Sequence, residues 1–143
     1  MEIYTTEIIT DYEPYMNFVN EFFIEVSKDE MIINKIAKKD ISFEILFIDN
    51  NEYANIHFKN GLITGGLGNY KDGEVDLKLR MSTSTFHKIM TGATNPLKAM
   101  NNNEFTVKGN VSKAMSLLPI FKLMTHSYKN ILDKHPHAIP KTT

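Results

Sequence analysis

This chain of 143 residues contains no cysteine and no tryptophan. Without cysteine there is no disulfide framework, no thiolate zinc site and no cysteine nucleophile. Long apolar runs are also missing, and a membrane-spanning helix needs about 20 consecutive apolar residues, so we expect no integral membrane association. The chain also has no large excess of acidic or basic residues, because its formal net charge is -1. We therefore expect no nucleic-acid partner and no anionic bilayer partner.

The first residues are acidic and lack the basic segment and apolar core of a secretory signal peptide. We therefore expect a cytoplasmic protein. The length predicts a single domain over residues 1–143. Within it, residues 1–13 are expected to form an N-terminal arm, and residues 135–143 a flexible C-terminal tail.

Methionine is the apolar residue that stands out in what is present. The chain has eight methionines, and five of them follow residue 80. Methionine fills irregular space and repacks against apolar shapes that vary, such as lipid chains. Ordinary core packing explains the same pattern, so both interpretations stay open.

The first half of the chain changes from a helical pattern to a strand pattern. Apolar residues recur at helical spacing from Tyr15 to Val26, and a capping pattern at residues 27–30 predicts a break and a second helix. Apolar residues then alternate, which predicts strands over residues 41–47, 53–59 and 62–67. Because Asn60-Gly61 is typical of a type I′ turn, these strands should form an antiparallel meander.

The second half begins with a fourth strand, predicted over residues 74–81, where apolar and charged residues alternate. Its charged face needs water, so the sheet should be covered on one side only. Ser82 or Thr83 is expected to cap a helix that ends at Gly92, and Asn95-Pro96 to open a further helical turn. Phe105 and Val107 predict the last strand.

The final helix, capped by Asn110, has more apolar residues than one stripe requires. Leu117, Ile120 and Leu123 are predicted to lie on neighbouring faces. The first predicted stripe consists of Val111, Ala114, Met115, Leu118, Phe121, Met124 (or Thr125), Tyr128 and Ile131 with Leu132. Pro119 predicts a kink or a restart within it. The surplus apolar surface needs a cover: the N-terminal helices, a partner chain or a bound lipid.

Residues 74–121 resemble the type-2 sterol carrier protein family, and a less specific similarity extends over roughly residues 15–125. The resemblance is carried by a series of residues in the family's order, namely Ser82, Phe86, Ile89, Gly92, Asn95-Pro96, Ala99, Val107, Gly109-Asn110, Ala114 and Leu117. Asn103 stands where the family has glycine, and asparagine accepts a positive φ. The chain also lacks the family's peroxisomal tripeptide, so we expect a stand-alone prokaryotic member.

The resemblance implies an α+β fold with a five-stranded, mostly antiparallel mixed sheet, covered on one face by helices in the order α-β-β-β-crossover-β-α-β-α. It also implies non-catalytic binding and transport of lipids or fatty acyl chains. We predict that the ligand lies in an apolar tunnel between the sheet and the C-terminal helices. The predicted lining residues are Phe86, Met90, Met100, Phe105, Met115, Leu118, Phe121 and Met124.

No catalytic constellation is visible, so we expect neither an enzyme nor a cofactor. His57, His87 and His126 lack zincin spacing, and Gly65–Gly68 is not followed by the lysine and hydroxyl of a phosphate loop. We therefore predict no metal site. Two alternatives to a lipid carrier stay open. One is a dimerisation or interaction module, including a homodimer, and the other is an accessory subunit of an enzyme that metabolises lipids or acyl thioesters.

Overall fold

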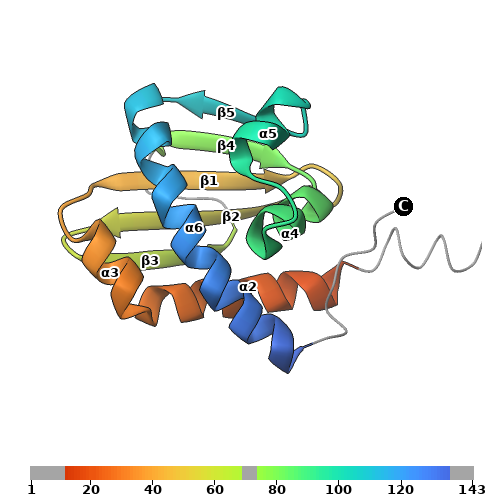
Figure 1. Ribbon diagram of the computed structural model, residues 1–143, viewed down its shortest axis with the longest axis horizontal. Helices are drawn as coiled ribbons and strands as arrows, with labels where there is room; N and C mark the ends of the chain where they lie inside the picture. The colour runs from red at the N-terminus through yellow and green to blue at the C-terminus, as the bar shows by residue number, and fades with distance from the viewer. Residues whose placement is uncertain (1–11, 69–73, 136–143) are drawn as a thin grey trace, which may run out of the picture.

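The computed structural model describes residues 12–68 and 74–135, in which helices cover one face of a five-stranded sheet (Figure 1). The strands are β1 (Ile41–Phe47), β2 (Glu52–Lys59), β3 (Leu62–Leu67), β4 (Leu77–Met81) and β5 (Phe105–Gly109). The helices are α2 (Glu13–Lys28), α3 (Glu30–Ile36), α4 (Thr83–Thr91), α5 (Pro96–Asn101) and α6 (Val111–Lys134). This order of elements confirms the predicted fold class.

The strands lie in the order β3-β2-β1-β4-β5. Neighbouring strands are antiparallel except β1 and β4, which pair in parallel. A parallel pair needs a crossover connection, so the chain passes from edge strand β3 back to the middle of the sheet before it forms β4. β5 then forms the opposite edge, next to β4.

The meander of β1, β2 and β3 follows the predicted pattern closely. Buried residues alternate along β1 because only one face of the sheet meets the helices. Asn60 and Gly61 have φ values of 55° and 74°. Two positive φ values in succession are what a type I′ turn requires, and this confirms the predicted hairpin.

β4 begins later than predicted, at Leu77 rather than at residue 74. The side chain of Asp76 explains the difference, because its Oδ2 accepts the backbone N–H of Ser42 at 2.9 Å. That N–H is therefore bound by a carboxylate instead of by a strand carbonyl. Lys113, on α6, forms an ion pair with the same oxygen at 3.1 Å.

The N-terminal helices meet at Asp29 rather than at Ser27. The side chain of Asp29 accepts the backbone N–H of Met31 at 2.9 Å and caps α3. The Ser27 hydroxyl instead donates to the Ile24 carbonyl of its own helix at 2.6 Å. The predicted break is therefore present, and the aspartate makes it because its carboxylate accepts N–H groups that lack an intrahelical partner.

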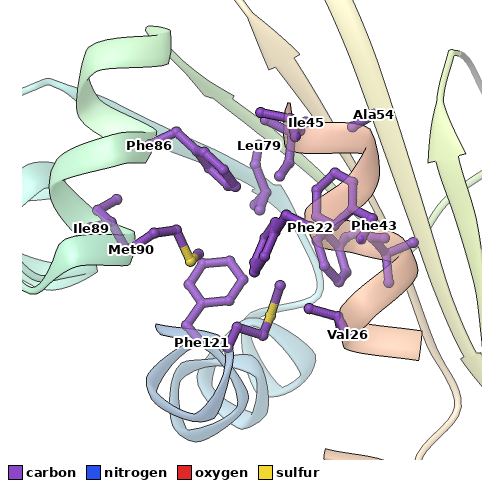
Figure 2. Close-up of a cluster of buried hydrophobic side chains, with 14 of the residues drawn as sticks. Phe22, Val26, Phe43, Ile45, Ala54, Leu79, Phe86, Ile89, Met90 and Phe121 are labelled. Atoms are coloured by element: carbon purple, nitrogen blue, oxygen red, sulfur yellow. The ribbon is translucent and has the colours of Figure 1, made fainter. Parts of the chain in front are cut away.

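The core lies between the sheet and helices α2, α4 and α6. Phe22 of α2, Phe43 of β1 and Phe86 of α4 are buried there together with Phe121 of α6 (Figure 2). α6 crosses the helical face of the sheet (Figure 1) and continues through Pro119 without a restart. Of the two outcomes predicted at Pro119, a kink or a restart, the restart is absent, because the remaining hydrogen bonds and the packing keep the helix continuous. The kink stays a prediction.

The face that α6 turns toward the core follows the predicted stripe only in the second half of the helix, where Phe121, Met124 and Tyr128 are buried. Leu117 and Ile120, which were predicted on neighbouring faces, are buried as well. Val111 and Met115, the first members of the predicted stripe, are 76% and 55% exposed. α6 has apolar residues on adjacent faces, so helical spacing alone did not determine which face meets the sheet.

Most of the predicted arm and tail lies outside the described residues. The single-domain prediction therefore stays a prediction. In the described part of the chain, no helix has both the length and the apolar content needed to cross a membrane.

Candidate functional site

A small apolar cavity lies between one edge of the sheet and the two helices that follow it. Its volume is about 170 Å³. The sheet contributes side chains from β4 and β5, and the rest of the wall comes from α5 and α6. The lining residues are Leu77, Leu79, Leu97, Met100, Phe105, Val107, Gly109, Val111, Ala114, Met115, Leu117, Leu118 and Phe121. No charged residue is among them, so the cavity suits an apolar group.

The turn from β5 into α6 brings two backbone segments close together beside the cavity. Gly109 has a φ of 130°, and a Cβ atom built there would lie 2.1 Å from the carbonyl oxygen of Asp76. Only glycine allows this close approach of the two backbones. The next residue, Asn110, caps α6 by accepting the N–H of Lys113 at 2.9 Å. α6 therefore starts directly beside the β4–β5 edge.

Large apolar side chains remain exposed at this cavity. Leu97 and Met100 of α5 are exposed, as are Val111 and Met115 of α6, and all four line it. Single exposed apolar residues are common, whereas a cluster at a cavity marks a binding surface. The cavity therefore has an apolar mouth.

A second hollow of about 530 Å³ lies on the other side of the same wall. Leu97, Leu118 and Phe121 line both spaces. The second hollow also has polar residues, including Asn95 and Lys122. The two hollows thus differ in chemistry: the first is apolar and the second is mixed.

The structure places the predicted tunnel residues in two groups. Five of them line the apolar cavity: Met100, Phe105, Met115, Leu118 and Phe121. The other three, Phe86, Met90 and Met124, are buried in the core and line neither hollow. Figure 2 shows Phe86 and Met90 within the core cluster. Other lining residues were not predicted from the sequence, namely Leu77, Leu79, Leu97, Val107 and Val111. The alternation along β4 and β5 could have identified Leu77, Leu79 and Val107, because it places them on the helical face of the sheet.

Two buried tyrosines and a half-buried histidine, which the sequence did not connect, meet at the margin of the core. The hydroxyls of Tyr15 and Tyr128 lie 2.8 Å apart, and Nδ1 of His87 lies 2.7 Å from the Tyr128 hydroxyl. Burial raises the pKa of both tyrosines, and it lowers the pKa of His87 from 6.5. None of the three lines either hollow. Their contacts join α2, α4 and α6, which is a structural role.

The described ranges, 12–68 and 74–135, contain no candidate set of metal ligands. They contain no group of three or more histidine, cysteine, aspartate or glutamate residues that could hold an ion. The distinctive chemistry of the two hollows is therefore apolar contact, with one charged group, Lys122, at the second.

Comparison with known proteins points to two related groups. The model of the family described as "Alkyl sulfatase C-terminal" matches residues 30–131. No curated protein sequence matches this chain. The family match includes every strand of the sheet and all of α5. It therefore contains all the residues that line the apolar cavity.

Solved structures share the fold at low sequence identity. Sterol carrier protein 2 from Yarrowia lipolytica in its apo form has a TM-score of 0.59 and 22% identity, over 77% of this chain and 88% of that one. A possible sterol carrier protein from Thermus thermophilus has a TM-score of 0.63 and 10% identity, over 80% and 86%. The inverting sec-alkylsulfatase Pisa1 from Pseudomonas sp. has a TM-score of 0.55 and 18% identity. That match covers 64% of this chain but only 14% of the alkylsulfatase.

Proposed function

Because this chain belongs to the alkyl sulfatase C-terminal family and has the sterol carrier protein 2 fold, we propose that it binds the alkyl or fatty acyl chain of a lipid. The observation that carries this proposal is the apolar cavity between the β4–β5 edge and helices α5 and α6. Exposed Met115 and Val111 at its mouth give an apolar chain a route from solvent.

The driving force for binding is the removal of methylene groups from water. Each buried methylene contributes about 0.8 kcal/mol, so a chain of about ten offers several kcal/mol after the cost of ordering it. Met100 and Met115 suit this role because methionine side chains adapt to different apolar shapes. We therefore expect the cavity to accept apolar chains of different shapes rather than one molecule.

The proposed role is non-catalytic. The described residues that line the cavity include no acid, base or nucleophile that could act on a bound chain. The family match supports a second role within this proposal, in which the domain presents an alkyl chain to an enzyme that acts on the head group. Either role needs the same cavity.

Native mass spectrometry with decanoate tests this function. The wild-type protein should form a one-to-one adduct and unfold at a higher temperature when decanoate is present. Ala114→Trp should fill the cavity and weaken the adduct at least tenfold, an order-of-magnitude expectation from the lost methylene burial. Lys129→Trp, on an exposed position of the same helix, is the matched control and should bind normally.

Two outcomes would contradict the proposal. The first is a wild-type protein that shows no adduct and no thermal shift with decanoate. The second is equal binding by the wild type and by a folded Ala114→Trp variant, which would place the chain elsewhere. A stable apo dimer that buries Val111 and Met115 would favour the interaction module instead.

A further inference from the structure

Charge is strongly separated along this chain even though its net charge is -1. Residues 1–76 carry 15 acidic and 6 basic residues, whereas residues 77–143 carry 2 acidic and 10 basic residues. Glu104 is the one acidic residue between positions 77 and 132, a range that contains every residue lining the two hollows. The segment of sequence that supplies the lining of both hollows therefore carries an excess of basic residues, and an excess of charge attracts ligands of the opposite sign.

The two hollows are adjacent to each other. They share Leu97, Leu118 and Phe121 as a common wall. The apolar cavity alone, at about 170 Å³, is smaller than the roughly 300–1,000 Å³ of typical small-molecule sites. The second hollow, at about 530 Å³, falls within that range. A chain that extends past the shared wall therefore gains the volume that the apolar cavity lacks.

Polarity increases along α6 in the direction of the second hollow. Lys122 follows Leu118 by four residues, and Thr125 follows Phe121 by four, so each polar residue lies one helical turn beyond a residue of the shared wall. Lys122 is exposed, lines the second hollow and forms no ion pair with any residue that the structure describes. Lys113, near the start of α6, is by contrast paired with Asp76 at 3.1 Å.

We propose that the ligand is an anionic amphiphile whose chain lies in the apolar cavity and whose carboxylate or sulfate binds Lys122 in the second hollow. This inference rests on the proposed function and adds the class of head group and the residue that selects it. The ammonium group of Lys122 supplies a charge-assisted hydrogen bond to the anion. The amide side chain of Asn95 lies on the α5 side of the same hollow.

Calorimetry with three ligands of equal chain length tests the assignment. Decanoate, decyl sulfate and decan-1-ol share the chain and differ in the head group. The wild type should bind both anions more tightly than the alcohol. Lys122→Gln should weaken decanoate about threefold to fivefold, the range expected for an exposed ion pair, and should leave decan-1-ol unchanged.

Reversing the charge of Lys122 and replacing two control lysines test whether the effect is specific to this position. Lys122→Glu should weaken both anions further and favour decyltrimethylammonium. Lys129→Gln lies on the same helix outside both hollows, and Lys98→Gln lies on α5 beside Leu97. Both controls should bind decanoate like the wild type. A loss confined to decyl sulfate in Lys122→Gln would restrict the head group to sulfates, and a loss confined to decanoate would restrict it to carboxylates.

The results separate this inference from the proposed function. If the wild type binds none of the three ligands, the proposed function itself fails. If it binds decanoate and decan-1-ol equally and Lys122→Gln changes neither, chain binding stands and the head-group site is wrong. If Lys98→Gln weakens decanoate and Lys122→Gln does not, the anion lies at the α5 side, and the assignment to Lys122 is overturned.

Discussion

Nδ1 of His87 lies 2.7 Å from the hydroxyl of Tyr128, although 41 residues separate them in the chain. The Tyr128 hydroxyl also lies 2.8 Å from that of Tyr15. When His87 is neutral with its proton on Nε2, Tyr15 donates to Tyr128 and Tyr128 donates to His87, so both buried hydroxyl protons are bound. Protonation turns Nδ1 into a donor, so Tyr128 can no longer donate to it and one of the two buried hydroxyl protons is left without an acceptor.

The stability of the fold should therefore depend on the charge of His87. Burial lowers its pKa below 6.5, so the folded state binds fewer protons than the unfolded state in that range. The stabilisation is complete above pH 6.5 and is lost as pH falls through the lowered pKa. Urea unfolding of the wild type between pH 7.5 and 5 should show this loss, and His87→Gln should flatten it. An equal slope in both proteins would contradict the prediction.

Tyr128→Phe should destabilise the protein by about 1–3 kcal/mol, because it leaves the buried Tyr15 hydroxyl without a partner. Tyr15→Phe should lower the free energy of unfolding by less, since Tyr128 still donates to His87. The double variant should cost less than the sum of the single changes, because it removes both buried hydroxyls together. Urea unfolding of all four proteins at pH 7.5 checks this, and strictly additive costs would show that the two hydroxyls are not coupled.

Gly109→Ala should be among the most damaging single changes in this chain. The new Cβ would lie 2.1 Å from the Asp76 carbonyl oxygen, and the φ of 130° is itself unfavourable for alanine. We expect a loss of about 2–4 kcal/mol, comparable to other strained or overpacked substitutions. Gly68→Ala is the matched control, because its φ is also positive but no atom lies within 4 Å of the added Cβ. In thermal unfolding, Gly109→Ala should have a much lower unfolding temperature than Gly68→Ala.

Much of the local structure could be predicted because it depends on neighbours in the chain. Alternation identified β1 and the meander, and Asn60-Gly61 identified its hairpin turn. Asn110 was predicted as the cap of α6, and its side chain does accept the N–H of Lys113. Asn103 has the positive φ of 61° that the family's glycine position requires.

The candidate site was harder to predict because two helices and a strand edge have to meet to form it. The methionine and phenylalanine pattern included both cavity and core residues. Met115 lines the cavity while Met124 is buried in the core, although both lie on α6. Composition does not separate these cases, since the difference depends on how α6 is rotated about its own axis.

The sequence by itself determined most of the secondary structure, helix caps such as Asn110, the absence of thiol chemistry and the separation of charge along the chain. These features follow from residue type and local spacing. Only the tertiary structure decided that β4 lies beside β1, that α6 turns Met124 to the core and Met115 to the cavity, and that His87 meets Tyr128. These features depend on which faces of distant segments pack together, and a helix with apolar residues on adjacent faces allows more than one answer until the sheet packs against it.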